Sequence, residues 1–268
     1  MKFPIYQLDA FTSRLFGGNP AAVVILDEWL PDSVLAAIAA ENNLAETAYV
    51  IPRSGITPLR WFTPTVEIDL CGHATLAAAD VLFRYRFPAL DRLTFSTRSG
   101  ELAVTREDAL LKMDFPARPG KPTGVTDALV SALGARPREA FLARDLLAIF
   151  DSESEVRSLR PDMQRIASLD AFAVITSAPG DKADFVSRFF APGAGIPEDP
   201  VTGSSHCTLV PYWAARLGKN NLTAVQVSPR GGDLLCELRG NRVVIAGYVV
   251  EYLRGEIEID IAESSPGN

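Results

Sequence analysis

Two segments of helical length in this chain are apolar on almost every side. They span residues 73–85 and 204–217, and both are rich in Ala, Leu, Val and aromatic side chains. A helix of that composition is expected to be buried all round, because a surface helix keeps one polar face. Short β-type segments surround both helices along the sequence. We therefore expect a helix enclosed by a curved sheet, and we expect it twice.

The residues that precede these helices look like two copies of one motif. Residues 61–73 and residues 189–206 each run from an aromatic strand through a Pro turn to a Gly and a His, and these are the 2 histidines of the chain. The first backbone N–H groups of a helix lack internal partners and attract anions. Gly72 and Gly203 allow a ligand to approach closely, although both glycines can also serve simply as turn residues. Two such helix starts facing one cleft would hold a carboxylate.

The length of the chain indicates its domain organisation. A chain of 268 residues is long enough for about two domains. The stretch 116–122, rich in Pro and Gly, is the best linker candidate. It separates an N-terminal half, 1–116, from a C-terminal half, 117–268, each with one of the apolar helices. The sequence leaves two alternatives for the C-terminal strand, which can belong to the second half or cross over to the first.

Composition excludes several classes of partner. The net charge is −7 and no basic block is present, whereas binding to a nucleic-acid backbone needs clustered Lys and Arg. The apolar helices are too short to span a bilayer, and the N-terminus lacks the apolar core of a signal peptide. The 3 cysteines do not form a disulfide framework. We expect a cytoplasmic protein that binds neither nucleic acid nor membrane.

Five short stretches in order resemble the PhzF family of phenazine biosynthesis, within the diaminopimelate epimerase-like superfamily. The resemblance implies an α+β fold with two pseudo-symmetric domains, each a barrel-like mixed or antiparallel sheet around a central helix. It also implies a homodimer and no cofactor. The matching stretches are GNPAAV (18–23), NLAETA (43–48), RWFTP (60–64), CGHAT (71–75) and EDPVTGS (198–204).

The resemblance also assigns roles to individual residues. The family's acid–base glutamate maps to Glu46, and its other catalytic positions map to His73, Asp199 and Ser204. We expect His73 to pair with Asp199 or to donate to the substrate. The positions expected to bind substrate lie in or beside the same motifs, and they are Asn19, Gly72, Thr202, Gly203 and Ser205.

The strand pattern independently supports a role for Glu46. Residues 46–51 read as a strand in which Glu46, Ala48 and Val50 share one face. If that face is inward, the carboxyl is buried, and burial moves a carboxyl pKa toward the pH at which a general acid–base works. The alternative is a solvated glutamate at a strand start. Likewise, Asp199 can simply begin a turn, and Ser204 can simply cap a helix.

Two positions depart from the related families. Ala45 stands where many PhzF-like proteins have Ser before the glutamate, which removes one hydrogen-bonding group. Related racemases use two cysteines, one at each helix start. Cys71 occupies the first of these positions, but Thr202 occupies the second. Because a hydroxyl is a far weaker acid than a thiol, the sequence disfavours racemisation by two thiols.

Four hypotheses follow for the function. The first is a cofactor-independent isomerase that transfers a proton on a small, anionic, carboxylate-bearing substrate in the cleft. The second is a racemase, epimerase or lyase on the same scaffold, and the third is a binding protein without catalysis. The fourth is a zinc site from Cys71, His73, His206 and Cys207, which the spacing disfavours. We predict the first, with no metal ion.

Overall fold

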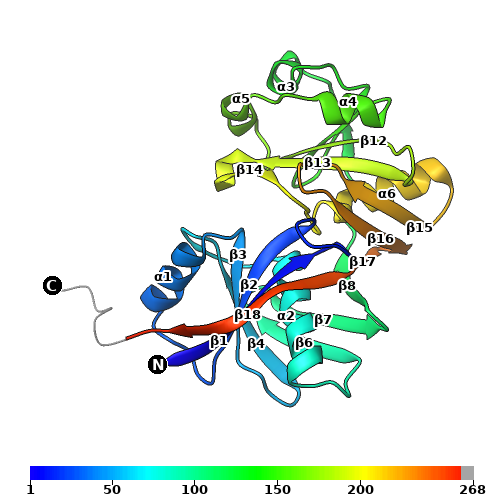
Figure 1. Cartoon of the computed structure of the whole chain (residues 1–268). Coiled ribbons are helices and arrows are strands. Elements are labelled where there is room, and N and C mark those ends of the chain that lie inside the picture. The colour runs from blue at the N-terminus through cyan, green and yellow to red at the C-terminus, as the bar shows by residue number, and fades with distance from the viewer. Residues whose placement is uncertain (261–268) are drawn as a thin grey trace. The chain divides into compact units, whose positions relative to one another are not determined.

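The computed structural model describes residues 1–260, and the chain divides into two compact units (Figure 1). The first unit comprises Met1–Met113 together with the chain from Gly247 onward, and the second comprises Asp114–Ala246. We expected the boundary between the two halves after residue 116, and the units divide after Met113. The C-terminal strand returns to the first unit because it pairs with the N-terminal strand along almost its whole length.

The first unit is a mixed sheet with two helices. Strand β1 pairs antiparallel with β18 and with β2, β2 runs parallel to β3, and β3 runs antiparallel to β4. Strand β4 then leads through a parallel pairing with β6 to β7 and β8. The elements are β1 (Lys2–Ala10), β2 (Asn19–Ile25), α1 (Asp32–Asn42), β3 (Glu46–Val50), β4 (Ile56–Phe62), β5 (Glu67–Ile68), α2 (Gly72–Tyr85), β6 (Arg92–Thr97), β7 (Gly100–Glu107), β8 (Leu110–Pro116) and β18 (Val249–Glu258).

Helix α2 is the enclosed helix that the sequence predicts. It spans Gly72–Tyr85, and every residue from His73 to Phe83 is buried. Strands β1, β2, β3, β7 and β18 all contact it, and Figure 1 shows them around it. The helix has no exposed face before its last turn, which explains why its sequence has no polar stripe.

Strand β3 is buried on both faces, and alternation along it determines where Glu46 points. Tyr49 belongs to an apolar cluster with Leu35 of α1, and its hydroxyl donates to the Leu35 carbonyl. Since neighbouring strand residues point to opposite faces, Glu46 and Ala48 face away from α1 and toward α2. The condition on which the sequence argument for Glu46 depended, an inward face shared with Ala48, is therefore met.

A single glycine holds the start of β2 against β1. Gly18 has φ +63, and a Cβ atom there would lie 2.1 Å from the carbonyl oxygen of Ala10. Only glycine fits this conformation and this contact. The turn delivers Asn19, the first residue of β2, into the interior, where it is fully buried.

The second unit is also a mixed sheet, with one long helix and three short ones. Strands β9, β10 and β11 pair antiparallel, β11 runs parallel to β12, and β13 joins β12, β14 and β15. Its elements are β9 (Lys121–Thr123), α3 (Asp127–Leu133), β10 (Glu139–Leu142), β11 (Leu146–Ile149), α4 (Glu153–Ser158), α5 (Met163–Ala167), β12 (Val174–Pro179), β13 (Phe185–Ala191), η1 (Pro192–Ala194), β14 (Ile196–Asp199), α6 (His206–Leu217), β15 (Asn221–Gln226), β16 (Gly232–Arg239) and β17 (Arg242–Gly247).

Helix α6 differs from the prediction in two ways. It begins at His206 rather than at residue 204, because residues 203–205 form a turn. It is buried from His206 to Val210, but Ala215 and Arg216 are exposed. The prediction of burial on all sides is therefore wrong for its last turn.

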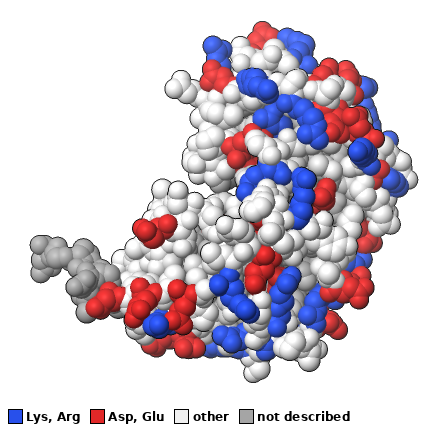
Figure 2. Space-filling model, in the orientation of Figure 1, with Lys and Arg blue, Asp and Glu red and all other residues white. Residues whose placement is uncertain are grey.

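Basic and acidic side chains are mixed on the face of the molecule in view. Figure 2 shows Lys and Arg interspersed with Asp and Glu there. Within residues 1–260, no helix combines the length and apolarity needed to cross a membrane.

Candidate active site

A carboxylate and an imidazole meet in the interior of the first unit. Glu46 is the first residue of β3, and His73 lies in the first turn of α2. Glu46 Oε2 lies 2.9 Å from His73 Nε2, and the two side chains are only 7% and 6% exposed. The parallel pairing of β2 with β3 and the contact of both strands with α2 bring these residues together.

The other ring nitrogen of His73 also has partners within the first unit. Asn19 Nδ2 lies 3.1 Å from His73 Nδ1, and Cys71 Sγ lies 3.5 Å from the same nitrogen. We expected Asn19 to bind substrate directly, but its side chain lies against the His73 ring. Both ring nitrogens of His73 already lie within 3.1 Å of a side chain, Glu46 or Asn19. The expectation that His73 pairs with Asp199 or donates to the substrate stays a prediction.

Burial and charge act against each other on these groups. Burial is the largest influence on His73 and disfavours its charged form, but Cys71 and Glu46 outweigh it and raise the pKa of His73 well above its usual value. Burial, followed by the charge of Glu46, raises the pKa of the Cys71 thiol to about 11. Cys71 is therefore a neutral thiol near pH 7, not a thiolate nucleophile.

Glu46, Cys71 and His73 also form a group that could hold a metal ion. Each offers one ligand atom, and these atoms lie within 4.8 Å of one another. An oxygen, a sulfur and a nitrogen form a set that zinc accepts. The zinc hypothesis drawn from the sequence relied on His206 and Cys207 instead of Glu46. His206 is in the second unit, where its Nδ1 lies 2.9 Å from the Thr202 carbonyl oxygen.

In the second unit, a buried glutamine fixes the loop that carries Asp199 and Thr202. Gln226 ends β15 and is fully buried. Its Nε2 donates to the Asp199 carbonyl at 2.7 Å, and its Oε1 accepts from the Thr202 N–H at 2.9 Å. The Thr202 hydroxyl donates to the Asp199 carboxylate. Sequence reasoning missed Gln226, although its alternation with Leu222 and Ala224 on the buried face of β15 was a usable signal.

The start of α6 does not reproduce the start of α2. The N–H groups of His206, Cys207 and Thr208 donate to the carbonyls of Gly203, Ser204 and Ser205, at 3.0, 3.2 and 3.0 Å. These three N–H groups are therefore occupied. The prediction that the first turn after Gly203 binds an anion is wrong for these three donors. At α2, by contrast, Cys71 is the residue before the helix, its side chain makes no capping hydrogen bond, and Gly72 is the first helical residue.

The two serines before α6 have different environments. Ser205 is fully buried, and its hydroxyl donates to the Thr202 carbonyl at 2.7 Å, which is a structural contact. Ser204 is only partly buried, and its hydroxyl lies 3.4 Å from Arg144 Nη2. Ser204 is therefore the serine whose hydroxyl lies beside a cation.

Arg144 is a second residue that sequence reasoning missed. It lies between β10 and β11, forms two hydrogen bonds with the Asp145 carboxylate, and stacks 4.6 Å from the ring centre of Phe172. Nothing in the local sequence distinguishes it from other loop arginines. Its contact with Ser204 joins positions 60 residues apart, which only the fold reveals.

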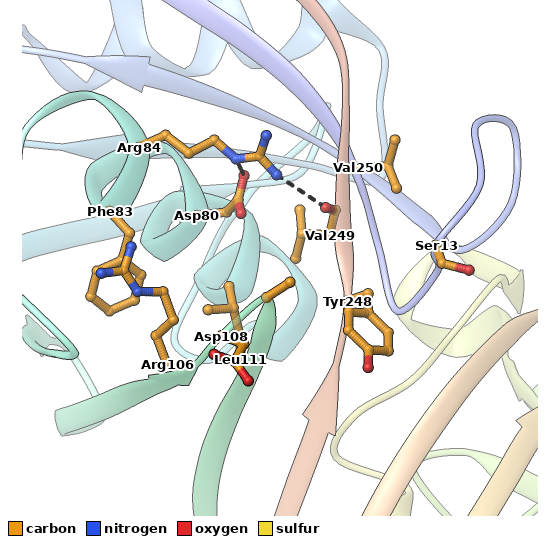
Figure 3. Close-up of a pocket in the computed structure, with 11 residues that line it drawn as sticks. Ser13, Asp80, Phe83, Arg84, Arg106, Asp108, Leu111, Tyr248, Val249 and Val250 are labelled. Atoms are coloured by element: carbon orange, nitrogen blue, oxygen red, sulfur yellow. Dashed lines mark hydrogen bonds and ion pairs between the residues drawn. The ribbon is translucent and has the colours of Figure 1, made fainter. Parts of the chain in front are cut away.

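The first unit also contains a pocket of about 380 Å³ away from the Glu46–His73 pair. Figure 3 shows Asp80 and Arg84 of α2 in it, joined by a 2.6 Å ion pair, with Tyr248 and Val249 opposite. Arg84 Nη2 also donates to the Val249 carbonyl. None of the site residues predicted from the sequence lines this pocket.

Two mixed-sheet units, each with one long apolar helix, define a protein of the diaminopimelate epimerase-like fold. A hydroxyproline epimerase from Agrobacterium vitis shares this fold, with a TM-score of 0.60 over 98% of this chain and 94% of that one at 10% identity. The predicted α+β fold is confirmed.

The chain belongs to the PhzC-PhzF family of phenazine biosynthesis-like proteins, whose model matches residues 8–255. A protein from Pseudomonas aeruginosa named an uncharacterized isomerase is 51% identical over 97% of this chain and all of its own length. The crystal structure of a PhzF family protein from Enterococcus faecalis superposes with a TM-score of 0.95, at 46% identity, over 97% of this chain and 100% of that one.

Proposed function

We propose that this protein is an isomerase that moves a proton between two positions of a small carboxylate-bearing substrate, with Glu46 as the proton carrier. One observation carries the proposal: Glu46 and His73 form a buried pair at 2.9 Å, at the start of the enclosed helix. The isomerase name of the relative from Pseudomonas aeruginosa and the family membership support the same class of reaction.

The chemistry needs one base that becomes an acid. The Glu46 carboxylate takes a proton from a substrate carbon, becomes a neutral carboxyl, and returns the proton to another carbon. The substrate gains and loses one proton, so the step balances without an oxidant or reductant. A proton on His73 Nε2 faces Glu46 and stabilises the carboxylate before the transfer.

The proposed substrate-orienting groups are Asp199, Thr202 and Ser204, with Arg144 beside Ser204. The cation of Arg144 favours an anionic substrate, and the Gln226 hydrogen bonds keep the Asp199–Thr202 loop in one conformation. Asn19 contributes by holding the His73 ring. The backbone at the two helix starts is shaped by Gly72, Gly203 and Ser205.

A deuterium-exchange screen tests this proposal. The chain is incubated in deuterated water with a panel of amino and hydroxy acids and their unsaturated analogues, and products are analysed by mass spectrometry and chiral chromatography. We expect one substrate class to move a double bond or a proton to a new carbon, and we expect Glu46→Gln to abolish that change. Glu41→Gln, an exposed residue of α1, is the matched control.

The same screen separates the competing hypotheses. Exchange with inversion at one carbon would indicate an epimerase. An epimerase that uses two thiols is disfavoured, because the pKa of Cys71 is raised and the second position is Thr202, whose hydroxyl donates to Asp199. A ligand that binds without any exchange, in wild type and Glu46→Gln alike, would indicate a binding protein.

A further inference from the structure

We propose that the cavity beside α2 shown in Figure 3 binds a small zwitterion, such as a free amino acid, with the ligand's ammonium group on Asp80 and its carboxylate on Arg84. The cavity measures about 380 Å³, which is within the range of small-molecule sites. None of the residues assigned above to the isomerase reaction lines it. The site is therefore additional to the proposed function.

The walls of the cavity come from three elements of the first unit. Asp80 and Arg84 belong to α2, Leu111 to β8 and Val249 to β18. Strand β18 pairs with β1, β8 pairs with β7, and the cavity lies between β18 and β8. Arg84, in the last turn of α2, has a side chain that is 46% exposed, so a ligand that enters the cavity can reach it.

Asp80 is the one acidic residue in the stretch of α2 from His73 to Phe83, all of which is buried. Removing a carboxylate from water is costly, and a buried ion pair adds little net stability. Arg84 Nε lies 2.6 Å from Asp80 Oδ2, yet burial outweighs this cation and raises the pKa of the Asp80 carboxyl. An ammonium group in the cavity would supply the additional positive charge that favours the ionised carboxylate.

Arg84 is fixed at the cavity wall by two contacts. Its Nε pairs with Asp80, and its Nη2 donates to the Val249 carbonyl at 3.4 Å. A guanidinium has five N–H donors in a planar fork that matches the geometry of a carboxylate. Because the head group is already held in place, little side-chain freedom is lost when a carboxylate binds to it.

The charge of the cavity lining favours a ligand that carries both signs. Acidic and basic side chains balance each other there, and they are Asp80, Asp108, Arg84 and Arg106. A simple cation or anion would bring one unbalanced charge into this partly enclosed space, whereas a zwitterion brings none. Leu111, Val249 and Val250 give the remaining wall an apolar surface that suits an aliphatic side chain.

The first test is a calorimetric titration of the full chain at pH 7 with the common amino acids that undergo no proton exchange in the screen above. Each amino acid that binds is compared with the carboxylic acid that lacks its amino group and with the amine that lacks its carboxylate. We expect at least one amino acid to bind, and to bind about tenfold or more tightly than either fragment. No binding at millimolar concentrations, or equal binding of a fragment, would overturn the proposal.

Asp80→Asn is the matching variant, because it keeps the shape of the side chain and removes its charge. We expect the affinity for the amino acid to fall about tenfold or more, while the affinity for the matching carboxylic acid stays the same. The preference for the zwitterion is then lost, which a merely structural role of Asp80 would not cause. Arg165→Met, which loses an exposed ion pair with Asp162, is the control. An unchanged preference in Asp80→Asn would overturn the proposal.

A second variant keeps the proposal testable if Asp80→Asn does not fold. Ala109 is exposed in the turn between β7 and β8 and lines the cavity, so Ala109→Trp places a large side chain there without changing a core residue. We expect Ala109→Trp to lose the binding of the amino acid. Full affinity in this variant would contradict the proposal.

The binding site and the proposed function can fail separately. Glu46→Gln should bind the amino acid with the affinity of wild type, whether or not Glu46 proves to be the proton carrier. Loss of binding in a folded Glu46→Gln would place the ligand at the Glu46–His73 pair and overturn the assignment to the cavity.

Discussion

Glu46 Oε2 lies 2.9 Å from His73 Nε2, and the two residues come from the start of a strand and the start of a helix. Both side chains are almost entirely shielded from water. The Glu46 carboxylate is one of the groups that raise the pKa of His73. The proposed proton carrier therefore lies in the first unit, on a strand residue that the duplicated motif does not contain.

The three cysteines should be unreactive in the native chain. All are buried, and burial raises the pKa of Cys71 and of Cys207 to about 11. Because the thiolate is the reactive form, iodoacetamide at pH 7 should leave the folded protein unmodified, whereas the unfolded chain should take up three adducts, as mass spectrometry can count. Rapid modification of Cys71 in the folded protein would instead reveal a thiolate and revive the thiol-based racemase hypothesis.

Replacing Gln226 by Ala should loosen the loop from Asp199 to Thr202. The change leaves the Asp199 carbonyl and the Thr202 N–H without their buried partner, so we expect the free energy of unfolding to fall by about 2–4 kcal/mol. Urea unfolding measures this. Gln164→Ala, at an exposed position in α5, should change stability by less than about 0.5 kcal/mol. Equal losses in the two variants would show that Gln226 is not a clamp.

His206 should make stability depend on pH in a defined direction. Burial lowers the pKa of His206 from 6.5 to about 4. Between these values the unfolded chain binds a proton that the folded chain does not, so stability is complete above pH 6.5 and is lost as pH falls toward 4. The loss is roughly 3 kcal/mol, at about 1.4 kcal/mol per pKa unit.

The variant His206→Asn isolates this contribution, since an amide can still donate to the Thr202 carbonyl. Urea unfolding of both proteins should show that the stability advantage of wild type over His206→Asn shrinks as the pH is lowered from 7.5 to 4.5. An advantage that stays constant across this range would mean that His206 does not titrate as the buried geometry requires.

Arg144→Met should weaken the binding of a carboxylate-bearing substrate. The variant removes the cation 3.4 Å from the Ser204 hydroxyl, and a charged hydrogen bond contributes about 1.5–3 kcal/mol. We expect KM to rise about tenfold with little change in kcat. Arg136→Met, which loses only an exposed ion pair with Asp127, is the control. A fall in kcat alone would place Arg144 elsewhere in the mechanism.

The sequence predicts α2 and the inward face of β3 because both depend on local patterns. An all-round apolar segment has to be enclosed, and alternation carries Glu46 inward with Ala48. The partners of His73 depend on long-range pairing: Asn19 lies 54 residues away, and only the packing of β2 against α2 brings it to the ring. No periodicity encodes that contact.

The start of α6 shows a different limit of sequence reasoning. The Gly and Ser residues at 203–205 fit either a helix start or a preceding turn, and hydrogen bonds to their carbonyls select the turn. The Gln226 clamp was missed for the same reason as Asn19, since its partners Asp199 and Thr202 lie more than 20 residues away. The expected homodimer stays a prediction.

The most direct test of the central claim is the rate of deuterium incorporation catalysed by Glu46→Gln. It is measured at pH 7 on the substrate that the screen identifies, beside wild type and Glu41→Gln, with thermal unfolding to verify the fold. If Glu46 carries the proton, the rate should fall by about 10²–10⁴-fold in Glu46→Gln and stay at the wild-type value in Glu41→Gln. A folded Glu46→Gln that exchanges at the wild-type rate would contradict the account.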